Sequence, residues 1–405
     1  MTAPATPYLA PGATLGVLGG GQLGRMFVHA AQRMGYATAV LDPDGDSPAG
    51  RISHHHVHAD YTDIAGLARL AGLAEAITTE FENVPAPSLE HLAVARPVAP
   101  AAAAVAIAQD RIREKAHFVR CGVACAPYAV IENAVQLDAV PDHLLPGILK
   151  TARLGYDGKG QQRVATRAEL AAAWHTTNGL PCVLEQLLPL EFECSVIVAR
   201  GHDAQMVHLP PQRNWHRDGI LAVTEVHEAS MPADVAQRAV EATRAIAEGL
   251  DYVGVLCVEF FVLADGSLVV NEMAPRPHNS GHWSMDACDV SQFELQVRTL
   301  AGLPLCPPRQ HSPAVMLNLL GDLWFPGPAA VTGREDRGDR ETAQEPPWAD
   351  ILALPGTHLH LYGKADARRG RKMGHLNITG ADIDAVRKTA DFAAALLGLP
   401  IPLSE

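Results

Sequence analysis

The chain has 405 residues, of which 48% are hydrophobic and 19% are charged, as in a globular protein large enough for two or three domains. The net charge of −13 argues against a general nucleic-acid binder, and no apolar run approaches the roughly 20 residues that span a membrane. Seven scattered cysteines, without a matching His or Cys pair, indicate reduced thiols. We therefore expect a cytoplasmic protein.

The N-terminal part of the chain has the pattern of a small parallel α/β domain. Residues 1–13 lack the features of a signal peptide and are expected to form a loose extension. Strands and helices then alternate over 14–108, up to an alanine-rich stretch. The predicted elements are strand Thr14–Leu18, helix Gln22–Met34, strand Ala37–Leu41, helix Ile64–Leu73 and strand Glu75–Thr79.

A glycine motif follows the first predicted strand. Gly19, Gly21 and Gly24 fit G-x-G-x-x-G, and Asp42 comes eighteen positions after the last of them. This pattern is the fingerprint of a dinucleotide-binding βαβ unit, so an NAD-dependent dehydrogenase is one hypothesis. The alternative is that the N–H groups at the start of the helix bind the anion of another substrate.

The remaining chain divides into a middle domain over 109–305 and a C-terminal domain over 306–405. Short strands, glycine-rich turns and a helix over 233–249 characterise the middle domain. Its predicted strands are Gly147–Lys150, Cys182–Glu185, Glu193–Ala199, Gly254–Leu263 and Ser267–Glu272. A Pro-rich stretch leads into the C-terminal domain, where we expect a hairpin within Thr357–Thr379, a helix over 381–397 and a surface insertion near 326–348.

The most informative stretch is Cys257-Val-Glu-Phe-Phe-Val-Leu-Ala-Asp-Gly-Ser-Leu-Val-Val-Asn-Glu272. The pair Asp265-Gly266 between two apolar runs predicts a two-residue hairpin turn, and counting outward places Glu259 opposite Glu272. Two facing carboxylates in an apolar hairpin repel each other, and Mg²⁺, or Mn²⁺ in its place, relieves that repulsion. A solvated pair of acids at the edge of the sheet is the alternative.

Two loops beside this hairpin carry groups that suit anions. The segment Met273-Ala-Pro-Arg-Pro-His-Asn-Ser-Gly-His-Trp283 offers the guanidinium of Arg276 and the neutral donors His278 and Asn279 to a small oxyanion. Upstream, Lys150 ends a buried strand before the glycine-rich loop 155–161, whose backbone N–H groups suit phosphates. An ordinary capped loop and an ordinary glycine turn are the alternatives.

The order of these elements resembles the ATP-grasp superfamily. A lysine, a glycine-rich loop, Glu185-Gln186, then Glu193 and finally Asn271-Glu272 across a hairpin follow one another as they do in that group. The resemblance implies α/β and α+β architecture: an N-terminal Rossmann-like parallel domain, a two-lobed ATP-grasp domain and a small C-terminal domain. It also implies that Mg-ATP is clamped between two lobes.

Longer motifs narrow the resemblance to the family of 5-(carboxyamino)imidazole ribonucleotide synthetases, the ATPase subunits of phosphoribosylaminoimidazole carboxylase. They are Gly-Gly-Gly-Gln-Leu-Gly-Arg-Met, Glu80-Phe-Glu-Asn83, Ala108-Gln-Asp-Arg111, Gly155-Tyr-Asp-Gly-Lys-Gly-Gln161, Asn214-Trp-His-Arg-Asp-Gly-Ile220, Asn271 to Trp283, Ser291-Gln-Phe-Glu-Leu and Gly370-Arg-Lys-Met-Gly-His375. The resemblance implies ATP-dependent carboxylation of 5-aminoimidazole ribonucleotide by bicarbonate, giving ADP and phosphate, in de novo purine synthesis. It also implies a homodimer and a separate mutase that uses the product.

The resemblance assigns roles to individual residues. The implied ATP contacts are Arg111, Lys150, Gly155, Gly158, Lys159, Gly160, Gln161, Glu185, Gln186, Glu193, His216 and Asn271, with Glu259 and Glu272 as the metal ligands. The implied catalytic residues are Arg276, His278 and Asn279 for bicarbonate and carboxyphosphate, with Tyr156 and Asp157 near the reacting amine and Asp157 as its proton acceptor. The implied substrate-binding residues are Gln22, Leu23, Glu80, Lys364, Arg371 and Lys372.

Three alternatives remain beside this interpretation. A dehydrogenase would leave the acidic hairpin and the 155–161 loop without a role. A related ATP-grasp ligase that uses formate or another ribonucleotide would need a different sequence at 278–283. A nucleotide sensor without activity would not need the oxyanion pocket. The histidine-rich stretch Ser53–His58 lacks the spacing of a metal site, and we expect exposed histidines in a loop.

Overall fold

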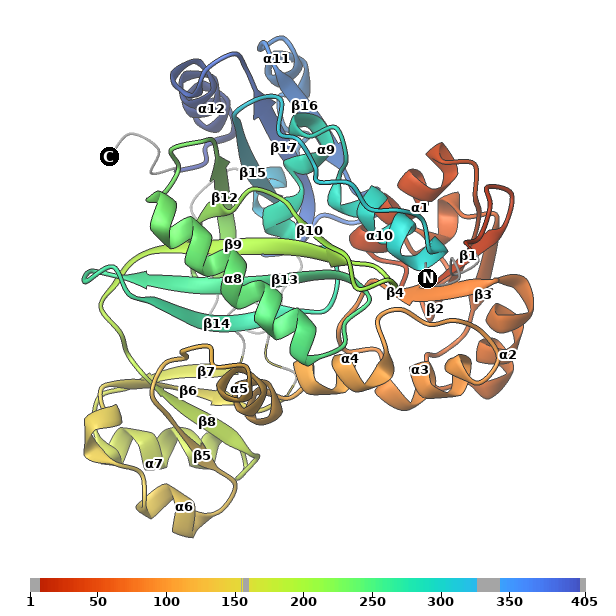
Figure 1. Ribbon diagram of the computed structural model, residues 1–405. Helices are drawn as coiled ribbons and strands as arrows, with labels where there is room; N and C mark the ends of the chain where they lie inside the picture. Colours follow the sequence, from red (N-terminus) through yellow and green to blue (C-terminus); the bar gives the residue numbers. More distant parts are fainter. Residues whose placement is uncertain (1–7, 154, 156–159, 326–342, 401–405) are drawn as a thin grey trace, which may run out of the picture.

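The computed structural model describes residues 8–153, 155, 160–325 and 343–400. The N-terminal part is a sheet of parallel strands in the order β3-β2-β1-β4, with helices packed on it (Figure 1). Its elements are β1 Thr14–Leu18, α1 Gln22–Arg33, β2 Ala37–Asp42, η1 Gly50–Ile52, β3 His55–His58, α2 Ile64–Leu73, β4 Ala76–Thr79, α3 Ala86–Ala93 and α4 Ala102–Ala108. The predicted parallel α/β domain is confirmed.

Two local predictions for this region are wrong. Residues 8–13 are not a loose extension, because Leu9 donates a backbone hydrogen bond to Ala301 and accepts one from the Tyr36 hydroxyl, at 2.8 and 2.7 Å. The histidine-rich stretch is not a loop, because its second half forms strand β3 at the edge of the sheet. Within the described ranges, these histidines do not assemble a group of three metal-ligating side chains.

The middle of the chain begins with helix α5, Arg111–Arg120, and continues into a small antiparallel lobe of strand order β5-β8-β6-β7. The lobe contains β5 Tyr128–Ile131, α6 Ala134–Asp138, η2 Asp142–Leu144, β6 Gly147–Thr151, β7 Gln161–Val164, α7 Arg167–Thr176 and β8 Cys182–Gln186. Leu149, Leu170 and Trp174 are among the side chains of its own core. This lobe lies apart from the larger sheet in Figure 1. It contains β6, the strand that carries Lys150.

A large sheet forms the body of the molecule, with the order β14-β13-β9-β11-β12-β15-β17-β16, and β10 paired with β9. The strands are β9 Leu190–Arg200, β10 Met206–His208, β11 Gln212–Arg217, β12 Ile220–Val226, β13 Gly254–Leu263, β14 Leu268–Ala274, β15 Ala314–Leu320, β16 Thr357–Leu361 and β17 Lys372–Thr379. The helices are α8 Ala233–Gly249, η3 Asn279–Gly281, α9 Ser284–Ala287, α10 Gln292–Ala301, η4 Gly321–Trp324, α11 Trp348–Leu352 and α12 Ile383–Leu397.

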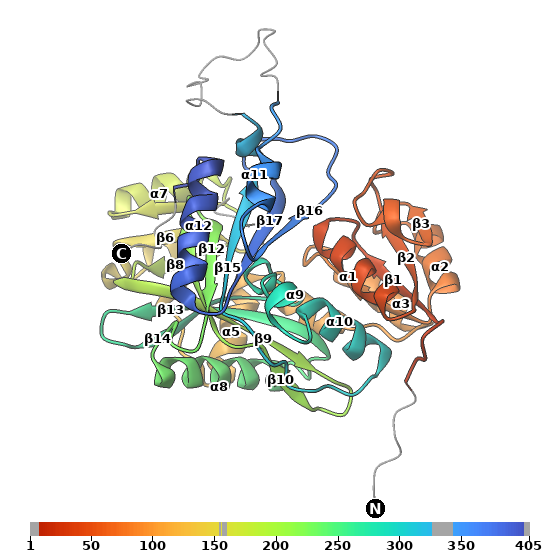
Figure 2. The ribbon, with the colours of Figure 1, turned by 90° about the horizontal axis from the view of Figure 1, so that it is seen from above.

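This sheet continues across the boundary that the sequence suggests at 305–306. Val223 on β12 pairs with Leu317 on β15, so the C-terminal strands extend the middle sheet instead of forming a sheet of their own. Helix α12 covers the C-terminal strands, and Figure 2 shows it lying along β12 and β15. The predicted hairpin within Thr357–Thr379 is confirmed by the antiparallel pairing of β16 with β17.

The two faces of strands β9 and β13 are covered by different helices. Val196 and Val258 pack toward α8, whereas Ile197 and Cys257 pack toward α9 and α10, as the alternation of side chains along a strand requires. Helix α10 also packs Val297 and other residues against the N-terminal domain. It therefore connects the N-terminal sheet to the large sheet, and the active-site loops lie between them.

The predicted insertion lies partly outside the described residues, which exclude 326–342. Of its last residues, Ala343, Gln344 and Glu345 are exposed at the surface. They join the fold where Gln344 donates a backbone hydrogen bond to Trp324 and the rings of Trp348 and Trp324 lie 5.6 Å apart. Within the described parts of the chain, none of the helices has the length and apolar character needed to cross a bilayer.

Candidate active site

Glu259 on β13 and Glu272 on β14 are direct cross-strand partners, as the sequence predicts. Glu259 is 8% exposed, and its Oε1 has no hydrogen-bond partner among the described residues. Burial, and then the neighbouring carboxylate, raise the pKa of Glu259 to about 8. The pair therefore carries a repulsion that a cation between the two carboxylates would relieve.

The turn of this hairpin differs from the predicted two-residue turn, although the register at the two acids is the predicted one. Leu263 donates a backbone hydrogen bond to Ser267 at 2.9 Å, so the loop has three residues, with Gly266 in the left-handed region at φ +77°. Asn271 is then a bulge, because the register shifts by one residue next to the acid pair. The longer loop and the bulge offset each other, and the two acids face each other as predicted.

A protonated histidine can partly compensate this negative charge. His216 Nδ1 lies 2.6 Å from Glu193 Oε2. Burial, the largest single influence, opposes protonation of His216. The hydrogen bond to Glu193 and the charge of Glu259 outweigh it and raise the pKa of His216 to about 8. Both side chains were predicted from the sequence, and the structure places them on adjacent strands next to the acid pair.

Glu185 holds two buried lysines at the base of the small lobe. Its Oε1 is 3.1 Å from Lys115 Nζ, and its Oε2 is 3.1 Å from Lys150 Nζ. Burial alone would raise the pKa of Glu185, but the two ammonium groups hold it below its usual range. Lys150 also contacts the bulge residue Asn271, Nζ to Oδ1 at 3.4 Å. One carboxylate thus orients two cations toward the same space.

The loop after β14 carries an arginine held in one orientation. Arg276 Nε donates to Glu82 Oε2, and its Nη1 donates to the carbonyl of Pro277 at 3.0 Å. The charge of Glu82 raises the pKa of Arg276 against the effect of burial. Because two of the three guanidinium nitrogens are used in this way, the remaining one, Nη2, is aimed by the protein itself.

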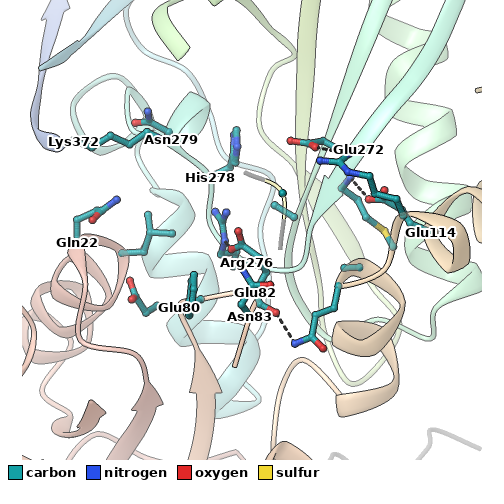
Figure 3. A pocket seen from close by; sticks show the side chains of 18 of the residues that line it. Gln22, Glu80, Glu82, Asn83, Glu114, Glu272, Arg276, His278, Asn279 and Lys372 are labelled. Atoms are coloured by element: carbon teal, nitrogen blue, oxygen red, sulfur yellow. Dashed lines mark hydrogen bonds and ion pairs between the residues drawn. The ribbon is translucent and has the colours of Figure 1, made fainter. Parts of the chain in front are cut away.

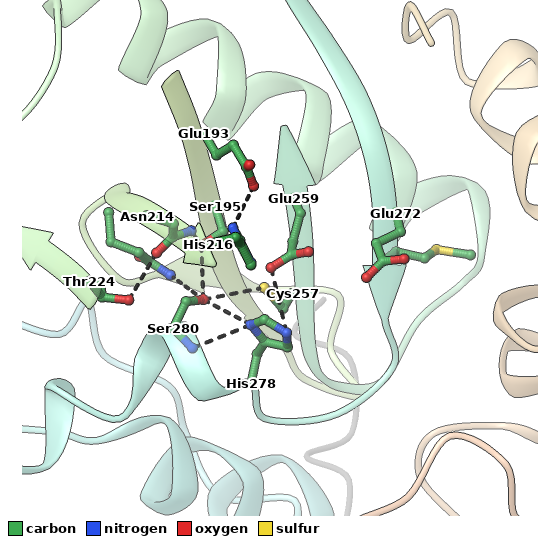
Figure 4. A network of polar contacts seen from close by, with 12 residues as sticks. Glu193, Ser195, Asn214, His216, Thr224, Cys257, Glu259, Glu272, His278 and Ser280 are labelled. Carbon is green, nitrogen blue, oxygen red and sulfur yellow. Dashed lines mark hydrogen bonds and ion pairs between the residues drawn. The ribbon is translucent and has the colours of Figure 1, made fainter. Parts of the chain in front are cut away.

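His278 is a neutral donor with a fixed tautomer. Its Nδ1 accepts the backbone N–H of Ser280 at 3.3 Å and lies 2.9 Å from the Ser280 hydroxyl (Figure 4). Burial, followed by the charge of Arg276, lowers the pKa of His278 well below its ordinary value. The proton therefore sits on Nε2, which lies 3.6 Å from Glu259 Oε1. His278 can donate a hydrogen bond but is a poor base.

Asn279 differs from an ordinary core residue, whose polar atoms are all hydrogen-bonded. It is 8% exposed, yet neither Nδ2 nor Oδ1 has a hydrogen-bond partner among the described residues. A buried amide without partners is costly, on the order of 1–3 kcal/mol per group. Such a group next to a cavity indicates a position where a ligand supplies the missing partners.

The N-terminal glycine motif is closed by the protein's own carboxylates. Glu80, which follows β4, accepts hydrogen bonds from the N–H groups of Gly21 and Gly24 at 3.0 and 2.8 Å. Asp42 accepts the N–H of Gly20 at 2.6 Å and the hydroxyl of Tyr61 at 2.7 Å. The expectation that these N–H groups bind a substrate anion is therefore wrong for Gly21 and Gly24.

The close approach of Glu80 explains why this turn is rich in glycine. A Cβ on Gly19, whose φ is +104°, would lie 2.5 Å from Glu80 Cγ, and one on Gly21 would lie 2.7 Å from Glu80 Oε1. In a dinucleotide-binding unit the glycines make room for a pyrophosphate, and the acid after the second strand binds a ribose. Here both places are taken, which argues against the dehydrogenase.

Two cavities meet at this set of side chains. The smaller, of about 420 Å³, lies between the N-terminal domain and the loop 276–282 (Figure 3). The larger, of about 760 Å³, lies between the small lobe and the large sheet. Both are lined by Arg111, Glu272, His278, Asn279 and Lys372.

Most of the predicted site residues line one cavity or the other. The larger cavity has Lys150, Gln161, Glu185, Gln186, Glu193, His216, Glu259 and Asn271 in its wall, and the smaller has Gln22, Leu23, Glu80, Gly155 and Arg276. Lys364, Arg371 and Gly160 line neither of them. Tyr156, Asp157, Gly158 and Lys159 lie outside the described residues.

Three charged residues at the site were not predicted. Lys115 and Glu114 lie on α5 next to the predicted Arg111, and Glu82 binds Arg276. Glu114 accepts the backbone N–H of Met273 at 2.8 Å, and burial raises its pKa to about 8. The spacing i, i+3, i+4 puts three charged side chains on one buried face of α5, a signal that the sequence carried. The Glu82–Arg276 pair spans 194 positions and gives no such signal.

Comparison with protein families supports each part of this architecture. The family description "ATP-grasp domain" matches residues 116–293, "Ribonucleotide synthetase preATP-grasp domain" matches 12–109, and "Phosphoribosylaminoimidazole carboxylase C-terminal domain" matches 314–389.

Individual relatives match over nearly the whole chain. N5-carboxyaminoimidazole ribonucleotide synthase of Brucella melitensis is 44% identical, over 91% of this chain and 96% of the relative. The Staphylococcus aureus synthetase in complex with ADP is 34% identical, with a TM-score of 0.86 over 98% and 100% of the two chains. The Aspergillus clavatus enzyme, solved with ADP and 5-aminoimidazole ribonucleotide, is 28% identical, with a TM-score of 0.84 over 96% and 99%. The chain belongs to the N5-carboxyaminoimidazole ribonucleotide synthase family, ATP-grasp ligases that carboxylate 5-aminoimidazole ribonucleotide in purine biosynthesis.

Proposed function

We propose that the two cavities divide the substrates of this reaction between them, with ATP in the larger one and 5-aminoimidazole ribonucleotide in the smaller. The observation that carries the proposal is that the cavities share Arg111, Glu272, His278, Asn279 and Lys372. At such a junction the terminal phosphate of ATP, bicarbonate and the substrate amine can meet without crossing bulk water. The rate then comes mainly from positioning and from stabilisation of charge.

In the larger cavity, Lys150 contacts the phosphates of ATP. Glu185 keeps the ammonium groups of Lys150 and Lys115 in place, and Lys115 thereby supports the position of Lys150. Phosphate contacts from the glycine-rich loop 155–161 are proposed from the sequence alone. Gln186 and Glu193 line the cavity wall and suit the purine edge and the ribose hydroxyls. Arg111, whose Nη1 lies 3.3 Å from Glu272 Oε2, faces the end of the nucleotide where the acids lie.

Glu259 and Glu272 fit a divalent cation. The supporting observations are their cross-strand pairing, the raised pKa of Glu259 and its Oε1 without a hydrogen-bond partner among the described residues. Mg²⁺, or Mn²⁺, held there would supply the positive charge that lets two desolvated carboxylates lie beside the phosphates of ATP. The protein's own contribution is to keep both carboxylates on one face of the hairpin.

Beside the junction, Arg276 on the side of the smaller cavity joins His278 and Asn279 in the pocket for bicarbonate and for the carboxyphosphate made from it. Arg276 offers one guanidinium nitrogen, His278 offers Nε2–H, and Asn279 offers an amide with no partner among the described residues. These donors are oriented before the reaction, so little reorganisation is needed as negative charge develops on the transferred phosphoryl group. Because Nε2 already carries the proton and burial lowers the pKa of His278, this side chain is a poor acceptor for the proton of the amine.

In the smaller cavity, Gln22, Leu23 and Glu80 contact the ribonucleotide. Glu80 keeps the glycine turn closed and presents the rest of its surface to the cavity. Lys372 lines both cavities and can contact the anions that meet at their junction. Tyr156 and Asp157, the latter as proton acceptor, are proposed from the sequence alone, as are phosphate contacts from Lys364 and Arg371.

Further parts of the proposal concern the organisation of the protein. We assign residues 14–108 to ribonucleotide binding, 109–305 to the ATP-grasp unit and 306–405 to a C-terminal unit built onto the same sheet. We also propose that the chain acts as a homodimer in the cytoplasm. A carbamate of an aminoimidazole is unstable, so a mutase must use the product soon after its release.

ADP release by the purified protein tests the proposed function. We expect ADP to form only when 5-aminoimidazole ribonucleotide and bicarbonate are both present, with Mg²⁺ and ATP. Dependence on formate in place of bicarbonate would instead favour the related formate-using ligase. Reduction of NAD, or protection by NAD in a thermal melt, would favour the dehydrogenase.

A further inference from the structure

A second histidine of the active-site loop, His282, has no role in the scheme above. It is 1% exposed and lines the smaller cavity but not the larger one. Its ring is packed among other rings, 5.6 Å from Phe293 and 4.7 Å from His375 between centroids. The ring is therefore held in one plane at the wall of the smaller cavity.

Gln292 at the start of α10 fixes the hydrogen bonding of His282. The Gln292 Oε1 accepts the backbone N–H of His278 at 2.9 Å, and its Nε2 donates to the His278 carbonyl at 2.8 Å. Because a backbone N–H can only donate, the orientation of this amide is determined. The second hydrogen of Nε2 points to His282 Nδ1, at 3.0 Å.

Gly281 shows how closely the side-chain amide of Gln292 is packed. A Cβ on Gly281 would lie 2.6 Å from Gln292 Oε1 and 2.2 Å from Ile197 Cδ1. Gln292 itself is fully buried. A flip of the amide would lose both hydrogen bonds to the backbone of His278, so its donor stays directed at His282.

It follows that Nδ1 of His282 is an acceptor and that the ring proton is on Nε2. Burial, with the positive charges of Lys372 and Arg276 acting in the same direction, lowers the pKa of His282 well below its ordinary value, in agreement with an uncharged ring. Nε2 has no hydrogen bond to a described residue. A neutral N–H donor is therefore available at the wall of the cavity.

We infer that His282 is a substrate-binding residue whose Nε2–H, fixed by Gln292, is donated to an acceptor oxygen of the ribonucleotide. This inference rests on the proposed function and assigns one contact within it. The reacting amine must lie at the junction of the two cavities. His282 is absent from that junction, and its ring neighbour Phe293 packs in one cluster with Leu23 on the side of the N-terminal domain. The contact is therefore with the sugar-phosphate part of the substrate.

Two substitutions test the roles of the two ring nitrogens of His282 separately. His282→Gln keeps an N–H donor near the position of Nε2, whereas His282→Asn keeps a group near Nδ1 for Gln292 and removes the donor from the cavity. We expect His282→Asn to raise KM for 5-aminoimidazole ribonucleotide about 10-fold, the effect of one lost hydrogen bond, with KM for ATP unchanged. His282→Gln should stay within about threefold of the wild type.

The control is His202→Asn, a change at an exposed histidine of a surface turn. It should leave every constant unchanged. A wild-type KM in His282→Asn, or equal damage in both His282 variants, would overturn the inference. Wild-type protein that forms ADP only with the ribonucleotide and bicarbonate keeps the proposed function intact in either case.

Nitrogen NMR of the wild-type protein gives a second test, which reads the tautomer of His282 directly. In protein labelled with ¹⁵N-histidine, His282 should be the neutral Nε2–H tautomer between about pH 6 and pH 8, and its Nε2 signal should shift when 5-aminoimidazole ribonucleotide is added. The signal is assigned by its absence from His282→Gln. An Nδ1–H tautomer, a charged ring, or no response to the ribonucleotide contradicts the inference.

Discussion

Glu259 lies directly opposite Glu272 in the β13–β14 hairpin, and the pair is partly withdrawn from water. The raised pKa of Glu259 has a consequence for stability. An unfolded glutamate releases its proton near pH 4.5, whereas this one holds it to about pH 8. Between these values the folded state binds more protons than the unfolded state, so the ligand-free protein should lose stability as the pH rises.

Glu259→Gln should therefore stabilise the ligand-free protein at pH 8 by on the order of 1–3 kcal/mol and flatten the decline above pH 5. The same change should abolish turnover, because the carboxylate is needed when Mg-ATP binds. Thermal melts between pH 5 and 8 and ADP assays measure the two effects. The control Glu248→Gln, at an exposed position on α8, should change neither. A destabilised Glu259→Gln would show that the acid is not strained in the free protein.

Lys115→Met should destabilise the protein by about 3–5 kcal/mol, because it leaves Glu185 with one of its two buried partners. It should also raise KM for ATP more than KM for the ribonucleotide, since Glu185, its partner, orients Lys150 at the wall of the larger cavity. Denaturant unfolding and steady-state kinetics check both expectations. Lys388→Met, at an exposed position on α12, provides the control. Equal effects on both KM values would remove the supporting role of Lys115 in ATP binding.

Gly19→Ala and Gly12→Ala form a matched pair. The two glycines have φ of +104° and +99°, so an alanine is strained equally at both, by about 1 kcal/mol. Only at Gly19 does the new Cβ collide with Glu80. We expect Gly12→Ala to remain active and Gly19→Ala to lose at least about 10-fold in affinity for the ribonucleotide, because Glu80 is displaced. Similar kinetics for the two variants would mean that closure of the turn by Glu80 has no part in substrate binding.

Arg276→Lys should lower kcat about 100-fold while ATP still binds, because an ammonium keeps the charge but cannot contact Glu82 and an oxyanion in the same plane. Arg69→Lys, on the exposed side of α2, is the control. Bicarbonate-dependent ADP release measures the loss, and nucleotide protection in a thermal melt measures ATP binding. Full activity of Arg276→Lys would show that charge alone suffices at this position.

The sequence predicts that Glu259 faces Glu272, but it does so through a turn that the structure only partly supports. The Asp265-Gly266 signal places the turn correctly, but the loop has three residues, and the bulge at Asn271 returns the register to the predicted one. A bulge leaves little trace in the hydrophobic pattern, because the residues on either side of it are still strand-like. The correct pairing of the two acids therefore came from two departures that offset each other.

Contacts between parts of the chain that are far apart in the sequence could not be predicted from the sequence. Strands and helices follow from local periodicity, and motifs of residue types mark Lys150 and Arg276. The partners that orient the side chains of the site come from distant parts of the chain. Glu82 binds Arg276 across 194 positions, and Gln292 on α10 accepts the backbone N–H of His278. The same holds for Glu80, whose place inside the glycine turn depends on the packing of β4 beside β1.

The carboxylate of Glu80 at the start of α1 also has a consequence for the ligands that proteins with this glycine turn can bind. A helix end that is neutralised by a built-in acid has no net attraction left for an incoming phosphate. A shared glycine signature can thus persist in two lineages while one recruits cofactors and the other excludes them. Converting this turn into a cofactor site would require Glu80 to leave the turn and Asp42 to give up its hydrogen bonds to Gly20 and Tyr61 before any new contact could form.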